Sequence, residues 1–198
     1  MTSYQLIAGA AALDEAMVAA GIERLSVVPA SEDLAGAEFE FIARQRREFL
    51  LGQALDGRVG KFDDVLIDCP PALNLLTINA LVAADRVLVP LQCEFYALEG
   101  LAHLLKKTVK LVRDKLNPGL DLLGILLTMF DGRTSLTLQI REEVNRYFPG
   151  QVFDTVIPRN VRLTEAPSHG RPVMLHDLKS SGSVAYLELT REVLNHDY

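Results

Sequence analysis

The sequence predicts an α/β protein with a doubly wound, mostly parallel β-sheet that carries helices on both faces. The first observation is the alternation along the chain of short strand-like runs with longer segments of helical periodicity, which is the order of repeated β-α-β units. The second is that several strand-like runs, such as 122–130, are continuously apolar rather than alternating. Strands of that kind are covered on both faces.

Each element has its own sequence signal. The strands are expected at 25–30, 64–68, 86–92, 122–130 and 152–158. The helices are expected at 32–55, 72–84, 97–116, 136–148 and about 183–194. The third helix should end at Asn117-Pro118-Gly119, because proline and glycine terminate helices. We find no internal repeat and no linker, so residues 1–198 are expected to form a single domain.

Composition limits the classes of function. Of the 198 residues, 49% are hydrophobic and 23% are charged, which indicates a substantial core and argues against disorder. The net charge is −6, so any binding of nucleic acid must use a local basic patch. Two cysteines, Cys69 and Cys93, are too few for a disulfide framework. The sequence has neither an apolar run of roughly 18 residues nor a signal peptide, so a cytoplasmic protein without a membrane segment is expected.

The segment Phe62–Leu73, "FDDVLIDCPPAL", resembles half of a nucleotide site. Asp68 follows an apolar run at the expected end of a strand, where a carboxylate can hold Mg²⁺ beside nucleotide phosphates. A simple turn-capping aspartate is the alternative. The corresponding phosphate loop would read G-x-x-x-x-G-K-[ST] between a strand and a helix.

The only approximation to that loop is "GRVGKF", Gly57–Phe62. Its glycines are too close together, and Phe62 follows Lys61 where a hydroxyl residue is needed. It also lies after a helix and before a strand, which is the reverse of the arrangement that binds phosphate at a helix N-terminus. We therefore expect a turn here.

Three longer strings resemble the ParA/Soj family of chromosome- and plasmid-partitioning ATPases. They are "VLIDCPPALNLLTINALVAADRVLVPLQCEFYALEGL", "GILLTMFDGRTSL" and "TVIPRNVRLTEAPSHGRPV". The resemblance runs from about Leu25 to the C-terminus and implies a P-loop NTPase-like fold. The family's first β-α-β unit, with its deviant Walker A loop, is absent, so 1–198 is identified as a ParA-like ATPase domain that is N-terminally truncated.

The resemblance implies a partitioning function that uses ATP and Mg²⁺. ATP would drive formation of a homodimer, the dimer would bind non-specific DNA on the nucleoid, and a ParB-like centromere-binding protein would stimulate hydrolysis. Phosphoryl transfer depends on the loop, its lysine and Mg²⁺, so this chain is expected to be inactive as an ATPase by itself. The alternative is a non-catalytic ParA-like fragment that acts only through protein or DNA association.

The resemblance also implies roles for individual residues. Asp68 matches the Walker B aspartate, which holds Mg²⁺ through water. Pro158, Arg159 and Asn160 match the loop beside the adenine base, with a plain turn as the alternative. Arg133 and Arg162 match arginines implicated in DNA binding, with solvated surface arginines as the alternative.

Other features favour simpler interpretations. Lys106, Lys110 and Arg113 share a helix face by spacing, which would extend a DNA footprint but is more typical of a solvated face. Glu165 and His169 are expected to be ordinary loop residues rather than an acid–base pair. An iron–sulfur reductase is disfavoured by the cysteine context. A MinD-like membrane ATPase is disfavoured because the C-terminal segment carries no cationic face.

Overall fold

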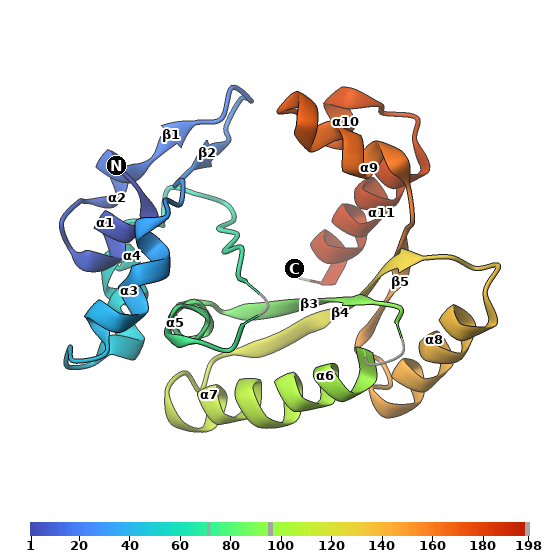
Figure 1. Cartoon of the computed structure of the whole chain (residues 1–198), viewed down its shortest axis with the longest axis horizontal. Helices are drawn as coiled ribbons and strands as arrows, with labels where there is room; N and C mark the ends of the chain where they lie inside the picture. The colour runs from blue at the N-terminus through green and yellow to red at the C-terminus, as the bar shows by residue number, and fades with distance from the viewer. Residues whose placement is uncertain (71, 95–96, 197–198) are drawn as a thin grey trace. The chain divides into compact units, whose positions relative to one another are not determined.

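The computed structural model describes residues 1–70, 72–94 and 97–196, which divide into two compact units (Figure 1). The first unit comprises Met1–Asp85 and Thr108–Leu120. The second comprises Arg86–Lys107 and Asp121–Tyr198.

A parallel sheet forms the centre of the second unit. It consists of β3 (Arg86–Gln92), β4 (Asp121–Phe130) and β5 (Val152–Pro158), in the order β3-β4-β5. Within this unit, α6 (Ala97–His103) and α8 (Ser135–Tyr147) lie on one side of the sheet and α11 (Ser181–His196) lies on the other (Figure 1). The predicted α/β class with parallel strands is confirmed.

Burial explains why these strands are continuously apolar. On one face, Leu126 packs in a cluster with Phe153 and with Ala185 and Leu189 of α11. Its neighbours Ile125 and Leu127 point to the opposite face because side chains alternate along a strand, and both are completely buried. Both faces of β4 are therefore covered, as the sequence pattern predicts.

Helices dominate the first unit. They are α1 (Ser3–Ala8), α2 (Leu13–Ala16), α3 (Asp33–Phe41), a 3₁₀ turn (Arg47–Phe49), α4 (Leu50–Leu55), α5 (Leu75–Ala83) and α7 (Lys110–Lys115). Phe41 of α3 lies at the centre of their core, with Ile7, Leu51 and Ala80 around it. This apolar cluster holds α1, α3, α4 and α5 together.

Two predicted elements of the first unit differ from the structure. The run 25–30 contributes only β2 (Ser26–Val27), which pairs antiparallel with β1 (Val18–Ala19). The helix predicted over 32–55 ends at Phe41, and residues 42–46 form a turn that includes Arg46, whose φ of 53° is left-handed. A right-handed helix cannot continue through such a residue.

The strand predicted at 64–68 is also wrong. Residues 64–70 adopt neither helix nor strand, and Leu66 is 96% exposed. A strand requires a neighbouring backbone to complete its hydrogen bonds, and no strand in the described part of the chain pairs with this segment. Its β-rich composition alone therefore does not make it a strand.

Candidate functional site

The carboxyl ends of the three parallel strands meet at one edge of the sheet. Gln92 of β3 pairs with Thr128 of β4, and Phe130 of β4 pairs with Pro158 of β5. The backbone N–H of Arg159 donates to the Phe130 carbonyl at 3.1 Å. The loop after β4 and the loop after β5 therefore start side by side, at the edge where α/β proteins bind ligands.

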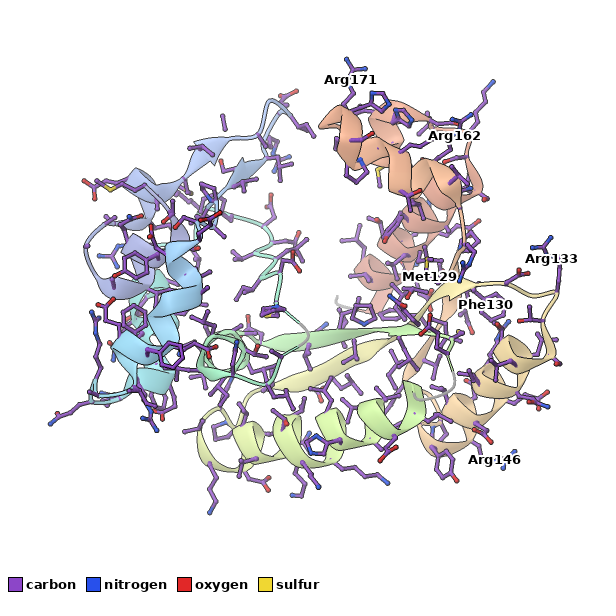
Figure 2. All side chains as sticks on the ribbon, viewed as in Figure 1. Met129, Phe130, Arg133, Arg146, Arg162 and Arg171 are labelled. Atoms are coloured by element: carbon purple, nitrogen blue, oxygen red, sulfur yellow. The ribbon has the colours of Figure 1, made fainter. Side chains whose placement is uncertain are left out.

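Arg133 lies on the loop between β4 and α8, and its guanidinium is directed by Asp131. Nε and Nη2 of Arg133 donate to the two carboxylate oxygens of Asp131 at 2.9 and 2.8 Å. The Arg133 side chain is nevertheless 89% exposed, and Figure 2 shows it extending from the loop. Hydrogen bonds from Arg133 lower the pKa of Asp131 to about 2, so the pair remains ionised over the physiological range.

A strained residue precedes this loop. Met129 has a φ of 51°, in the left-handed region that non-glycine residues rarely occupy, and the register between β4 and β5 shifts between Leu127 and Phe130. Strain of this kind is concentrated at functional sites in proteins. No signal in the sequence distinguishes Met129 from the rest of its apolar run.

Asn160 connects β5 to α9 (Val161–Glu165). Its Oδ1 accepts from the backbone N–H of Arg162 at 2.8 Å, which caps the helix, and its Nδ2 donates to Ser181 Oγ at 2.6 Å. The cap places Arg162 in the first turn of α9, close to the carboxyl edge. The Asn160 amide is thus used within the protein, and the predicted contact of 158–160 with adenine stays a prediction.

Arg162 is held by two carboxylates. Its Nη1 donates to Glu165 Oε2 at 2.7 Å, and its Nε lies 3.3 Å from Asp177 Oδ2. About half of the side chain is exposed, and Figure 2 shows it on the outer side of α9. The hydrogen bond to Glu165 raises the pKa of Arg162 above its ordinary value.

The carboxylate of Glu165 has a histidine neighbour that the sequence did not single out. His176, at the end of α10 (Val173–His176), places Nε2 3.8 Å from Glu165 Oε2. His169 stacks on His176 with ring centroids 4.9 Å apart. The partner of Glu165 is therefore His176 rather than His169, and sequence spacing alone could not reveal this tertiary contact.

Two segments of the first unit, 57–62 and 64–70, bear on the predicted nucleotide site. The structure confirms the turn predicted at 57–62. Lys61, within this turn, forms an ion pair with Asp14. Asp68 lies in the irregular segment 64–70 of the first unit. Across the described residues, no group of three or more His, Cys, Asp or Glu side chains is placed to hold a metal.

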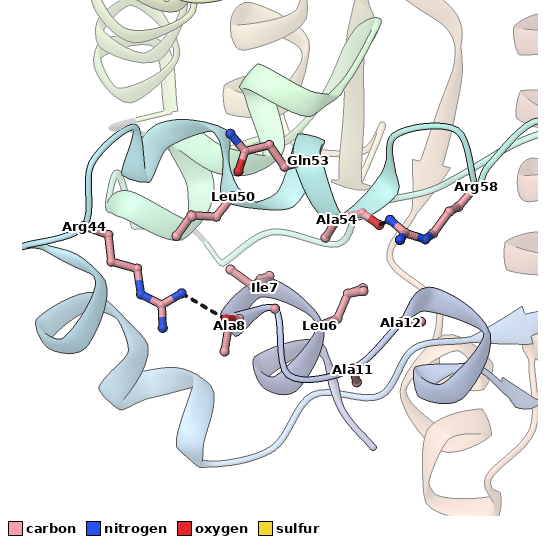
Figure 3. A pocket seen from close by; sticks show the side chains of 11 residues that line it. Leu6, Ile7, Ala8, Ala11, Ala12, Arg44, Leu50, Gln53, Ala54 and Arg58 are labelled. Atoms are coloured by element: carbon pink, nitrogen blue, oxygen red, sulfur yellow. Dashed lines mark hydrogen bonds between the residues drawn. The ribbon is translucent and has the colours of Figure 1, made fainter.

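A pocket of about 400 Å³ lies in the first unit (Figure 3). Arg44 lies at its border and donates from Nη1 to the Ala8 carbonyl at 3.0 Å. The pocket contains none of the predicted site residues. It is lined by Leu6, Ile7, Ala8, Gly9, Ala11, Ala12, Arg44, Leu50, Gln53, Ala54 and Arg58.

The basic helix predicted at 97–116 is helical over 97–115, but residues Leu104–Val109 are π-helical. The α-helical spacing that placed Lys106, Lys110 and Arg113 on one face therefore does not apply along the whole segment. Lys110 Nζ also donates to Asp114 Oδ2 at 2.6 Å, which lowers the pKa of Asp114. These observations favour a solvated surface for the lysines.

Solved structures define the class of fold. The crystal structure of cobyrinic acid a,c-diamide synthase from Mycobacterium smegmatis with a bound ATP analogue and magnesium superposes with a TM-score of 0.83 at 36% identity. The match covers 99% of this chain and 72% of that one. The chain therefore has an α/β fold of the P-loop NTPase type.

Sequence relatives define the family. A family model described as an AAA domain matches residues 1–122. The chromosome partitioning protein ParA of Myxococcus xanthus (strain DK1622) is 50% identical over 196 residues, which are 99% of this chain and 69% of that protein. The sporulation initiation inhibitor protein Soj of Bacillus subtilis (strain 168) is 50% identical over 190 residues, which are 96% of this chain and 75% of that protein. The chain belongs to the ParA/Soj family of partitioning proteins.

These relatives support a ParA-like role in partitioning. ATP analogues, ADP and magnesium occur in solved structures of similar fold, which supports ATP and Mg²⁺ as ligands of the family. Within the described residues, no helix combines the length and apolarity needed to cross a membrane.

Proposed function

We propose that the chain is a partitioning protein that binds DNA non-specifically through the carboxyl edge of the β3-β4-β5 sheet. The observation that supports this most is the placement of Arg133 and Arg162, exposed arginines that follow neighbouring strands at the same edge. Guanidinium groups suit phosphate contacts, which position a protein on DNA without reading its sequence. A chain with a net charge of −6 requires such a local contact.

Family membership supports the rest of the proposal. We propose that the two units belong to one ParA-like domain, that the active species is a homodimer, and that a ParB-like protein is its partner on the nucleoid. Asp68 would contribute to Mg²⁺ binding, and Pro158, Arg159 and Asn160 would border the adenine, once a phosphate loop is present. The second candidate is a ParA-like protein that acts only through association with other proteins or with DNA.

DNA binding by this surface is expected to depend strongly on salt. Each phosphate that a cation neutralises contributes about −0.9 to the slope of log affinity against log salt concentration. If Arg133 and Arg162 each contact one phosphate, the slope should be about −2 per bound chain. Fluorescence anisotropy over a salt series, with two labelled duplexes of unrelated sequence, measures both properties. A slope near zero, or clear preference for one duplex, would contradict phosphate-based binding.

Nucleotide binding separates the two candidate functions. We expect no tight binding of ATP–Mg²⁺ by the chain alone, because Lys61, in the segment that comes nearest to a phosphate loop in sequence, is engaged by Asp14. Isothermal titration calorimetry with ATP–Mg²⁺ provides the measurement. A dissociation constant of about 1 μM, roughly −8 kcal/mol, would show that the chain builds a nucleotide site in another way.

A further inference from the structure

The ion pairs of Arg162 are unbalanced in charge. One guanidinium faces two carboxylates, Glu165 at 2.7 Å and Asp177 at 3.3 Å, so the three groups sum to −1 (+1 −1 −1). A DNA phosphate that approaches Arg162 also approaches both carboxylates. Without a further cation beside it, this arrangement is a weak phosphate site.

The histidine pair is placed to change that balance. His176 Nε2 lies 3.8 Å from the same Glu165 oxygen that Arg162 contacts, and the His176 side chain is only 19% exposed. The His169 ring stacks on it at an interplanar angle of 20°. A proton on His176 would give Glu165 a second cationic partner and bring the group to neutrality.

Charged groups on several elements of this unit lie near the pair. On α9, Glu165 faces His176, and Arg162 contacts the same Glu165 oxygen. His169, at the end of the 3₁₀ turn Ala166–His169, stacks on His176. Asp177 directly follows His176 in the chain. Arg171 lies between the two histidines in sequence and, in Figure 2, on the same side of this unit as Arg162. From α11, Ser183 Oγ donates a hydrogen bond to the Asp177 carbonyl at 2.6 Å.

We propose that protonation of the His169–His176 pair increases the DNA affinity of the surface around Arg162. This inference rests on the proposed DNA-binding function and adds its regulation by pH. Protonated histidines relieve the excess of negative charge, and Arg162 then meets phosphate in a neutral or positive surface. Affinity is therefore high when the histidines carry protons and falls as rising pH removes them.

Histidine is the group expected to respond near neutral pH. Its charge ordinarily changes between about pH 5 and 8, unlike that of carboxylates and arginine. The hydrogen bond from Arg162 lowers the pKa of Glu165, which keeps that carboxylate ionised throughout the same range. The chain has four histidines, of which His103 lies exposed on α6 and provides a matched control.

The test measures DNA affinity of the full chain by fluorescence anisotropy at about pH 5.5 and about pH 7.5, at constant ionic strength. One added positive charge at the surface is equivalent to at most one neutralised phosphate, so at about 0.1 M salt binding should tighten by up to roughly fivefold to tenfold at the lower pH. His176→Gln should lose most of this change, whereas His103→Gln should retain it. Glu165→Gln should act in the opposite direction and bind more tightly than the wild type at about pH 7.5. This variant tests for a gain of affinity, which misfolding of the protein cannot produce.

The outcomes separate this inference from the function on which it rests. If Arg162→Glu weakens binding but the wild type responds to pH no more than His176→Gln does, the proton linkage is wrong and the DNA surface stands. If Arg162→Glu binds DNA as tightly as the wild type at both pH values, the assignment of the DNA surface is wrong, and the linkage is overturned with it.

Discussion

Reversing both arginines, in Arg133→Glu/Arg162→Glu, is expected to weaken DNA binding by roughly a hundredfold. Loss of one neutralised phosphate at about 0.1 M salt corresponds to nearly tenfold in affinity, and two such losses multiply. The new carboxylates would also repel the phosphates. Anisotropy titrations at a fixed low salt concentration and at constant pH measure the change.

Arg146→Glu is the matched control for this double variant. Arg146 lies exposed in the last turn of α8, which runs from the loop after β4 towards the start of β5 (Figure 2). It therefore lies towards the opposite edge of the sheet. The same change of charge there should alter affinity by no more than about twofold, since more distant charges are screened by salt. Equal losses in the control and in the double variant would show that binding follows net charge rather than this edge.

Phe41→Ala should remove about 3–5 kcal/mol from the free energy of unfolding. Phe41 is completely buried among the helices of the first unit, and its ring lies 6.1 Å from that of Tyr4. The Arg44 guanidinium also lies over the ring, 4.3 Å from its centre. Against a typical total stability of about 5–15 kcal/mol, the loss is large. Urea denaturation followed by circular dichroism gives the difference.

Phe39→Ala, on the same helix, is the control: it makes the same substitution at an exposed position, so any difference in stability reflects burial of the side chain. Its side chain is 86% exposed, so the same truncation should change stability by less than about 0.5 kcal/mol. Similar losses for the two phenylalanines would mean that α3 does not pack through Phe41 as described.

The parts of the fold that the sequence predicts well are those whose pattern is local. The continuous apolar run 122–130 predicts both ends of β4, and Asn117-Pro118-Gly119 predicts the end of the preceding helix. Each observed boundary lies within a residue or two of its prediction. The run 64–68 also has an apolar, β-rich centre, Val65–Ile67, but a strand depends on a partner that its own residues do not specify. The left-handed turn at Arg46 likewise contains no glycine or proline from which a turn could be predicted.

The site was predictable only in part. Resemblance to a family indicates Arg133 and Arg162, and the structure places both after neighbouring strands. Their electrostatic partners are less accessible to sequence reasoning. Asp177 and His176 meet Arg162 and Glu165 only because α10 packs against α9, a contact between residues 11 to 15 positions apart in the chain. Helical periodicity does not predict such a contact.

Hydrogen–deuterium exchange with and without non-specific duplex DNA tests most directly whether this edge of the sheet binds DNA. DNA should slow exchange at the backbone amides of 131–134 and 159–165, which carry Arg133 and Arg162, while 104–115 exchanges at an unchanged rate. Slowed exchange confined to the lysine-containing segment 104–115, with both arginine loops unaffected, would contradict the account and move the DNA contact to that helix.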